Sequence, residues 1–394
     1  MIKNFMFTSE SVTAGHPDKL CDMISDAVVD KFIRQDPYAR VFAECAVSSA
    51  ILFVAARFAS GVHVDVPKLA RDMIREAGYD QPDFNPETCS ILSSLKSLPE
   101  EACAHFDEFH LTDEEIERIP VKNQVTVFGF ACDQTPQLMP LPVTLAHKLS
   151  RQLDRVRRQR MLSYLIPDGK VQVGVEYKNR RPVRIHSVVV TATQKSLTDP
   201  SLDRLRKDIR EAVVEPVFTD ESIRPDSKTN IKVNPDGLYT GGPASHSGLT
   251  GRKNAIDTYG EYSRHSGKAL SGKDPLRIDR TGAYAARFAA KNVVAAKLAT
   301  ECEITLSYSI GQSSPVSIQA QTFGTGRISD TDITDLVRKR FDFRLAAILR
   351  DFRLRYLPGE HPEGFYRKLS AYGHFGRSDM DLPWENTELV SIQK

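Results

Sequence analysis

Segments with the apolar spacing of a helix alternate along the chain with segments that have the apolar pattern of a strand. Apolar residues three and four positions apart predict helices, whereas alternation and short β-branched runs predict strands. The helical spacing covers residues 18–35, 66–78, 142–160, 201–216, 281–299 and 331–350. The strand pattern covers residues 40–58, 122–133, 170–178, 184–194, 302–311 and 316–323. This order predicts an α/β protein, with no low-complexity linker and no repeat visible in the residues.

The start of the first predicted helix carries chemically active side chains. The buried face of this helix is marked by Leu20, Ile24, Ala27, Val28 and Phe32. Just before them, His16, Asp18 and Lys19 supply a proton donor, a ligand for a hard metal ion and a positive charge. Because the N–H groups at a helix start attract anions, the cluster predicts a site for a charged ligand. The alternative is an ordinary N-cap with exposed polar neighbours.

Two glycine-rich runs carry cations and predict contacts to phosphate. Residues 248–253 read GLTGRK, and residues 267–273 read GKALSGK. Glycines let backbone N–H groups approach phosphate oxygens, and the cations stabilise a phosphate leaving group. The second run fits G-x-x-x-x-G-K, but Asp274 and Pro275 follow where a P-loop requires Ser or Thr, which argues against that motif. Two ordinary turns with solvated lysines are the other interpretation.

Composition narrows the class of protein. A chain of 394 residues with 41% apolar content is long enough for two or three domains. Its formal charge of +2 gives no sign of a nucleic-acid partner. Six cysteines without C-x-x-C spacing predict reduced core residues. There is no apolar run of the roughly 20 residues that a bilayer requires and no signal-peptide pattern, so we expect a cytoplasmic protein without a membrane partner.

Several long motifs together resemble the S-adenosylmethionine synthetase (methionine adenosyltransferase) family. They are GHPDK at 15–19, GLTGRK at 248–253, SGKDP at 271–275, AYAAR at 283–287 and AYGHFGR at 371–377. The similarity runs from about Phe7 to Trp384, in the family's order and with similar spacing. Independent motifs in register are far more specific than any one of them.

The resemblance implies an architecture. It implies an α+β fold of three similar βαβ-type domains, each a sheet with helices on one face, around a pseudo-threefold axis. We expect the sequence blocks 1–104, 118–230 and 231–385, with structural domains that exchange segments across these boundaries. The family also implies a homodimer or homotetramer whose active sites lie between subunits. Residues 100–118 correspond to a mobile loop over the active site, in which 111–116 has the pattern of a capped short helix.

The resemblance also implies a reaction. The sulfur of methionine attacks C5′ of ATP and expels the triphosphate, which is then cleaved to phosphate and pyrophosphate, with Mg²⁺ and K⁺ as cofactors. A thioether has no proton to lose, so no general base is needed. Catalysis must come from alignment of the sulfur with C5′ and from stabilising charge on the triphosphate. This agrees with motifs that are rich in cations and poor in bases.

Each family position that contacts ATP or a metal ion has a matching residue in this sequence. The implied metal ligands are Asp18 and Asp279 for Mg²⁺ and Glu44 for K⁺. The implied phosphate contacts are His16, beside the breaking C5′–O bond, with Lys170, Arg252, Lys253 and Lys273. Asp168 is expected at the ribose and Tyr239 at the adenine, although Tyr239 is one residue out of register. A solvated surface charge is the alternative for each residue taken singly.

The methionine half departs from the family. A glutamate becomes Arg57, two aspartates become Asn123 and His246, a lysine becomes Arg277, and the lid glutamine falls near Ser97. In the family these positions contact the methionine ammonium and carboxylate. The changes remove up to three negative charges from the place of the ammonium, and a desolvated ammonium facing a cation is unfavourable by several kcal/mol.

Three hypotheses remain open on the sequence. The first is a methionine adenosyltransferase with an altered amino-acid clamp, the product of drift. The second keeps the ATP chemistry but uses another acceptor, neutral or anionic where methionine carries its ammonium. The third is a non-catalytic homologue that regulates an active partner, and the complete metal and phosphate set argues against it. We expect ATP and a small-molecule acceptor as the ligands.

Overall fold

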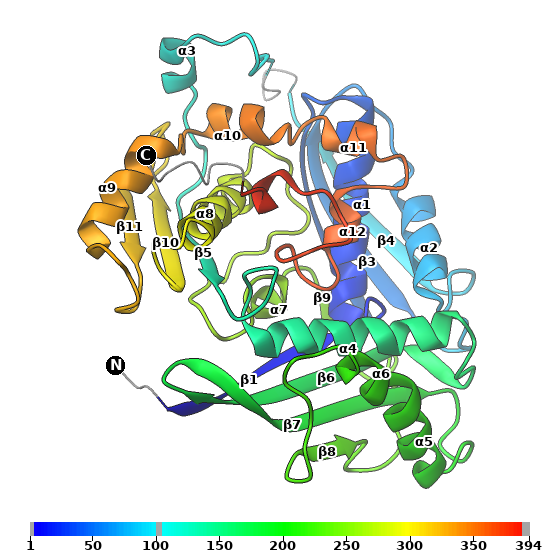
Figure 1. The fold of residues 1–394 in the computed structure, drawn as a ribbon. Coiled ribbons are helices and arrows are strands. Elements are labelled where there is room, and N and C mark those ends of the chain that lie inside the picture. The colour runs from blue at the N-terminus through cyan, green and yellow to red at the C-terminus, as the bar shows by residue number, and fades with distance from the viewer. Residues whose placement is uncertain (1–3, 100–104, 388–394) are drawn as a thin grey trace.

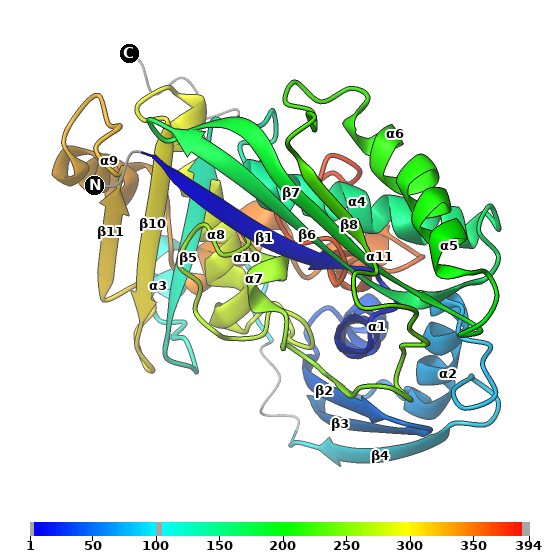
Figure 2. The same cartoon turned by 90° about the horizontal axis from the view of Figure 1, so that it is seen from below.

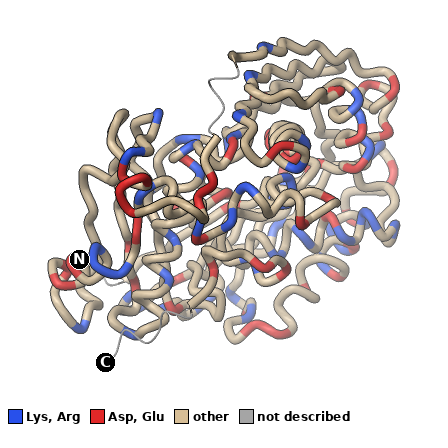
Figure 3. The backbone as a smooth tube through the Cα atoms, turned by 90° about the horizontal axis from the view of Figure 1, so that it is seen from above, with Lys and Arg blue, Asp and Glu red and all other residues tan. Residues whose placement is uncertain are grey.

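The computed structural model describes residues 4–99 and 105–387, and its strands form three separate sheets (Figures 1 and 2). Each sheet is mainly antiparallel and is covered by helices on one face. The chain is therefore α+β, as the motifs implied. Lys and Arg are interspersed with Asp and Glu along the whole backbone, which agrees with the small net charge (Figure 3).

The first sheet has the order β4-β3-β2-β9 and carries α1 and α2 on one face (Figure 2). Its strands are β2 (Arg40–Ser48), β3 (Ile51–Ala59), β4 (Ser90–Ser97) and β9 (Gly248–Leu249). The helices are α1 (Pro17–Gln35) and α2 (Val66–Ala77). The single strand predicted over 40–58 is a hairpin, because Ser49 turns the chain at φ 50°.

The second sheet has the order β1-β6-β7-β8 and packs against α4. Its strands are β1 (Phe5–Val12), β6 (Leu165–Lys178), β7 (Arg181–Gln194) and β8 (Asn230–Val233). The helices on this side are α4 (Leu141–Arg158), α5 (Leu202–Ile209) and α6 (Glu215–Phe218), with a π-helical turn over Arg210–Val214. Strand β6 carries Asp168 and Lys170 toward the first sheet's helix α1.

The third sheet has the order β11-β10-β5. It consists of β5 (Val125–Cys132), β10 (Glu301–Tyr308) and β11 (Ser317–Gln321), with α8 (Ile278–Ala295) and α9 (Asp330–Arg340) against it and α10 (Leu345–Phe352) against α8. The helix predicted over 331–350 is two helices, because Phe341 is extended. Short helices complete the chain: α3 (Asp113–Glu117), α7 (Asn254–Asp257), α11 (Leu357–Glu360), α12 (Tyr366–Leu369) and a 3₁₀ turn (Pro383–Glu385).

Each sheet takes strands from distant parts of the chain. Strand β1 pairs with β6, β5 pairs with β10, and β9 pairs with β2. The sequence blocks 1–104, 118–230 and 231–385 thus share strands, and as domains they stay a prediction. The short capped helix predicted at 111–116 is confirmed as α3, in which Thr112 and Glu115 form a capping box. Ile116 of α3 is buried against α10, and the role of 100–118 as a lid, part of which lies outside the described residues, stays a prediction.

Helix α1 is buried on nearly every side, and its polar face holds three loops. The aspartates of this face are spaced four residues apart, at Asp18, Asp22, Asp26 and Asp30. Each accepts a backbone N–H: from Leu249 at 3.0 Å, from Gly251 at 2.7 Å, from Gly272 at 2.8 Å and from Tyr366 at 2.9 Å, respectively. A buried carboxylate needs such partners. Helix α1 therefore fixes both glycine-rich runs beside its own start.

Lys19 does not serve as a free cation at the helix start. It is completely buried and donates to Asp22 at 2.7 Å and to Asp257. Burial alone would lower the pKa of Lys19, but these two carboxylates hold it above its ordinary value. The prediction that Lys19 helps to attract an anion is therefore wrong, because its charge is already neutralised within the core.

Candidate active site

A cavity of about 460 Å³ brings together residues that the sequence places far apart. Its lining includes His16 at the N-cap of α1, Asp168 and Lys170 on β6, and Tyr239 and His246 in the loop that precedes β9. All five were predicted as site residues from the motifs. Leu238 and Leu197 add apolar surface beside Tyr239, as a planar base would require.

His16 is neutral in this environment. Its Nδ1 accepts the backbone N–H of Asp18 at 3.2 Å, so the ring caps the helix and carries its proton on Nε2. Burial lowers the pKa of His16 to about 4, although Asp168 and Asp18 act in the opposite direction. At neutral pH the ring therefore offers an N–H donor to the cavity. The alternative of an N-cap with exposed neighbours is excluded, since Asp18 and Lys19 are both buried.

Asp168 and His246 form an ion pair on the wall of the cavity. Nε2 of His246 lies 2.7 Å from Oδ2 of Asp168, which also accepts the backbone N–H of Gly242 at 2.8 Å. Burial would raise the pKa of Asp168, but the hydrogen bond from His246 holds it below its ordinary value. The same hydrogen bond raises the pKa of His246 against the effect of partial burial. His246 is thus engaged by an acid of its own chain through a hydrogen bond.

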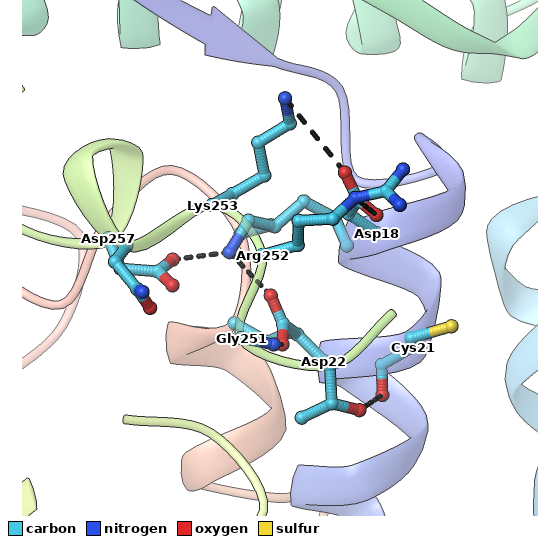
Figure 4. A network of polar contacts seen from close by, with 12 residues as sticks. Asp18, Cys21, Asp22, Gly251, Arg252, Lys253 and Asp257 are labelled. Carbon is cyan, nitrogen blue, oxygen red and sulfur yellow. Dashed lines mark hydrogen bonds and ion pairs between the residues drawn. The ribbon is translucent and has the colours of Figure 1, made fainter. Parts of the chain in front are cut away.

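The carboxylate of Asp18 lies close to both cations of the first glycine-rich run, Arg252 and Lys253. Oδ1 of Asp18 lies 3.0 Å from Nε of Arg252 and accepts the N–H of Leu249. Oδ2 is buried without a hydrogen bond, 3.8 Å from Nδ1 of His16 and 3.9 Å from Nζ of Lys253. Figure 4 shows Arg252 and Lys253 converging on Asp18.

Glu10 is a part of this cluster that the sequence did not reveal. It lies 2.7 Å from Nζ of Lys170 and 3.6 Å from Nζ of Lys253, and so holds both cations at the cavity rim. Partial burial would raise the pKa of Glu10, but the hydrogen bond and charge of Lys170 hold it below its ordinary value. It was missed because strand β1 was not predicted, although the alternation in FMFTSESV was the available signal.

A second cluster forms at the start of α8. Nζ of Lys273 lies 3.3 Å from Oδ1 of Asp279, and Asn123 donates from Nδ2 to Oδ2 of Asp279 at 2.8 Å. The guanidinium carbon of Arg277 lies 4.8 Å from the centre of the Phe42 ring. Burial lowers the pKa of Lys273, although Asp279 acts against this. Four predicted site residues are thus together here.

Two of the remaining predicted residues, Glu44 and Arg57, lie on the face of the first sheet that the helices leave uncovered. Glu44 on β2 and Arg57 on β3 are exposed, and their side chains have no hydrogen-bond partner within residues 4–99 and 105–387. Ser97 ends β4, where Oγ donates to the carbonyl of Leu98 at 3.4 Å. In the described part of the chain, no hydrogen bond or ion pair joins Lys273 to Arg252 or Lys253. No direct polar contact among the described residues therefore joins the cations of the two clusters.

The described residues include one group with metal-ligand spacing, His16, Asp168 and His246, whose ligand atoms lie within 4.8 Å of one another. In this structure, however, His246 and Asp168 are already hydrogen-bonded to each other. A larger cavity, of about 520 Å³, is lined by several arginines. Two of them are neutralised by acids, Arg158 by Asp154 at 2.6 Å and Arg377 by Asp379 at 2.8 Å.

Among the described residues there is no helix that is both long and apolar enough to cross a membrane. Cys21, Cys45, Cys89, Cys132 and Cys302 are free and buried, which confirms the prediction for these five, while Cys103 lies outside the described residues.

Comparison with known proteins gives three consecutive family matches. S-adenosylmethionine synthetase N-terminal, central and C-terminal domains match residues 4–99, 118–239 and 240–386. The S-adenosylmethionine synthase of Microcystis aeruginosa is 46% identical over 408 residues, covering 100% of this chain and 98% of the relative. That of Gloeobacter violaceus is 46% identical over 412 residues, with the same coverage. That of Synechococcus elongatus is 45% identical over 402 residues, covering 98% and 96%.

The motifs, the three sheet-and-helix units and these full-length matches agree. The chain belongs to the S-adenosylmethionine synthetase family and is an enzyme of the adenosyltransferase type.

Proposed function

We propose that this enzyme transfers the adenosyl group of ATP to the sulfur of a small acceptor that lacks the free ammonium of methionine. The sulfur attacks C5′, the C5′–O bond breaks, and its electron pair leaves with the triphosphate, which is then cleaved. The observation that supports the proposal is the pair of clusters described above, which contain residues expected to bind ATP and in which His246 and Asn123 stand where acids were expected around an ammonium.

The residues of the first cluster fit the ATP end of the reaction. His16 holds a neutral N–H toward the cavity and is suited to donate to the leaving oxygen. Lys170, Arg252 and Lys253 lie where they can compensate charge on the departing triphosphate. Tyr239 and the apolar residues beside it fit the adenine, and Asp168 fits the ribose.

Two carboxylates fit the expected Mg²⁺. Oδ2 of Asp18 and Oδ1 of Asp279 are buried and accept no hydrogen bond. Such orphaned acceptors are costly, and carboxylate oxygens are the ligands that Mg²⁺ prefers. We assign both residues to Mg²⁺ and the exposed Glu44 to K⁺. When bound, Mg²⁺ neutralises charge on the phosphate oxygens.

We infer a homodimer that joins the first cluster of one subunit to the second cluster of its partner. The uncovered face of the first sheet exposes large apolar side chains: Ile51 (52% exposed), Phe53 (43%), Leu92 (54%) and Leu249 (44%). The strand register places all four on one face, beside Glu44 and Arg57. A contiguous apolar face of this kind is typical of a protein interface. The free, buried cysteines favour a reducing compartment such as the cytoplasm.

The assignment of the acceptor depends on the three residues that stand where the family has acids, Arg57, Asn123 and His246. His246 donates to Asp168, and Asn123 donates to Asp279, so each replacement neutralises or holds an acid instead of adding one. Arg57 adds a positive charge without a partner among the described residues. An ammonium near Arg57 would be repelled, whereas a neutral or anionic group would not.

The test is incubation of the full chain with ATP, Mg²⁺, K⁺ and either methionine or its deaminated analogue 4-(methylthio)butanoate. We expect release of phosphate and pyrophosphate with formation of the sulfonium product, and a kcat/KM at least about 10-fold higher for the analogue. Asp18→Asn should remove the Mg²⁺-dependent activity with both acceptors.

An ordinary low KM for methionine would contradict the acceptor assignment and favour the drift hypothesis. Absence of ATP binding would instead favour a non-catalytic homologue. Restoring Glu at position 57 and Asp at positions 123 and 246 together should improve the use of methionine. Each change alone should do less, because charges in contact are coupled.

A further inference from the structure

Two cations, Arg57 and Lys96, lie next to each other on the uncovered face of the first sheet, in one row with Phe42. Phe42 on β2 is directly opposite Arg57 on β3, and Arg57 is directly opposite Lys96 on β4. On the other side, Phe42 forms an isolated bridge with Lys273. Neighbouring strands are about 4.8 Å apart, so these residues are immediate neighbours across the sheet. Lys96 was not among the residues predicted from the sequence.

The side chains at the outer end of this row lack partners. Arg57 and Lys96 are exposed and make no side-chain hydrogen bond or ion pair within the described part of the chain. Like charges directly opposite each other destabilise a sheet. Glu44 is the one acid within strands β2, β3 and β4, and it lies opposite Ala55 rather than Arg57. The fold thus places two cations side by side without an acid to separate them.

Arg277 adds a third cation beside Phe42. Its guanidinium carbon lies 4.8 Å from the centre of the Phe42 ring, and its Nε is buried without a hydrogen-bond partner. Two other buried cations nearby have acidic partners: Arg280 donates to both oxygens of Asp26 at 2.6 and 2.8 Å, and Lys273 lies 3.3 Å from Asp279. The Nε of Arg280 also lacks a hydrogen-bond partner, but Arg277 differs in having no ion pair among the described residues. An unpartnered donor that is buried requires a ligand or a partner group.

We propose that the acceptor is a thioether with two acidic groups, one bound by Arg277 and the other bound between Arg57 and Lys96. This inference rests on the function proposed above and names the class of its acceptor. A carboxylate between Arg57 and Lys96 would replace their mutual repulsion by two charge-assisted hydrogen bonds. A carboxylate at Arg277 would satisfy the buried Nε. Phe42 adjoins both Arg57 and Arg277, and its ring offers an apolar surface to the carbon chain of the thioether.

The experiment compares a dicarboxylate with a monocarboxylate of the same thioether. The acceptors are 2-[2-(methylthio)ethyl]malonate and 4-(methylthio)butanoate, each with ATP, Mg²⁺ and K⁺ and the full chain. We expect kcat/KM about 10- to 100-fold higher for the malonate. Lys96→Ala should remove about 10-fold or more of the malonate kcat/KM and leave that of the butanoate within about two-fold.

A matched control is Lys178→Ala, which removes an exposed lysine from the far end of β6 and should change neither value. Lys96→Glu is the charge-reversed variant, and it should abolish the preference for the malonate. Because Lys96 is exposed on an edge strand, both variants are expected to fold. A malonate preference that persists in Lys96→Glu, or equal losses with both acceptors, would overturn the inference.

A binding measurement separates this inference from the function on which it rests. The ether analogue of the malonate carries the same charges but has oxygen in place of the nucleophilic sulfur. We expect calorimetry to show its binding to the unmodified enzyme and a Kd raised about 10-fold or more in Lys96→Ala. Binding without turnover would contradict the adenosyl transfer and leave the anion site standing. Turnover of ATP with no difference between malonate and butanoate would contradict the anion site alone.

Discussion

Lys273 is buried beside Asp279, and its proposed role is to compensate charge on the triphosphate. Its side chain is 9% exposed and lies 3.3 Å from Asp279, which already has Asn123 as a donor. Lys273→Ala should therefore lower kcat about 100-fold or more, because a cation at the triphosphate supplies roughly 3 kcal/mol to a charged transition state. The unfolding free energy should fall less, by about 1–2 kcal/mol, since Asp279 keeps one hydrogen bond. Turnover assays and urea unfolding measure the two effects.

The control for this prediction is Lys268→Ala, which removes an exposed lysine from the same glycine-rich run. It should leave both quantities unchanged. If Lys273→Ala lowers the unfolding free energy by as much as it raises the activation free energy calculated from kcat, the role of Lys273 is structural.

His246 gives the cavity a dependence on pH whose sign follows from its hydrogen bond. The bond to Asp168 raises the pKa of His246 in the folded state above the ordinary value of about 6.5. The stability that the charged pair contributes is fully present below pH 6.5 and is lost as the pH rises through the raised pKa. Asp168 stays ionised throughout, because its own pKa is held low.

The comparison variant is His246→Asn, which keeps a donor but cannot be charged. We expect the stability difference between the unmodified enzyme and His246→Asn to shrink between pH 6 and pH 9 in urea unfolding at a fixed protein concentration. A difference that is independent of pH would mean that His246 is neutral beside Asp168.

At the residue scale, the sequence predicted the site residues but not their partners. His16, Asp18 and Lys253 could be named because each belongs to a contiguous motif. Glu10 and Lys96 could not, because their importance depends on strand pairing between distant segments. The roles that the motifs implied for individual residues stay predictions, and the geometry now limits what each side chain can contact.

At the scale of elements, the contact between α1 and β9 has no room for a larger residue than glycine. A Cβ on Gly248 would lie 2.2 Å from the carbonyl carbon of Pro17. Gly248→Ala must therefore push β9 away from the start of α1 and weaken the bond from Leu249 to Asp18. We expect a loss of about 1–3 kcal/mol of stability, as in other overpacked sites, and lower turnover.

Gly61→Ala is the matched control, because a Cβ there meets no atom within 4 Å and its φ is not in the left-handed region. It should change the unfolding free energy by less than about 0.5 kcal/mol. If Gly248→Ala and Gly61→Ala both lose stability, the clash with Pro17 does not explain the effect at position 248.

Elements with strong periodicity were predicted well and short edge strands were not. Helices α1, α2 and α4 match the predicted ranges within a few residues because each buries an apolar stripe. Strand β4 was missed because its sequence, SILSSLKS, is exposed at almost every position and has no clear alternation. The burial of the polar face of α1 was not predicted, because its aspartates are buried by loops that come from remote parts of the chain.

At the scale of the whole molecule, the proposed dimer makes the apolar face of the first sheet responsible for bringing the two clusters together. Phe53→Glu places a charge in the centre of that face, so we expect a monomer in sedimentation and loss of turnover. The melting temperature at low protein concentration should change little, because Phe53 is 43% exposed within one chain. Met161→Glu is the control, since Met161 is 61% exposed outside this sheet. A dimer that persists in Phe53→Glu would contradict the assigned interface.

The family motifs predicted the three-unit fold, but the separation of the two clusters could be seen only in the folded chain. His16 belongs to the cluster at β6, and Lys273 belongs to the cluster at α8. If each active site combines one cluster from each subunit, mixing two inactive variants must restore activity. In a heterodimer of His16→Ala and Lys273→Ala, one site carries both defects and the other carries neither.

Random mixing of these two variants by co-expression should therefore recover about a quarter of the unmodified turnover, since half of the dimers are heterodimers and half of their sites are intact. Each variant alone should be inactive, because His16 and Lys273 both act on the triphosphate end of the reaction. The control is co-expression of His16→Ala with Lys170→Ala, whose defects belong to the same cluster. In that heterodimer every site carries one defect, so activity should stay low. Recovery in neither mixture would mean that the two clusters of one chain serve the same site, and equal recovery in both would contradict the assignment of Lys170 to the cluster of His16.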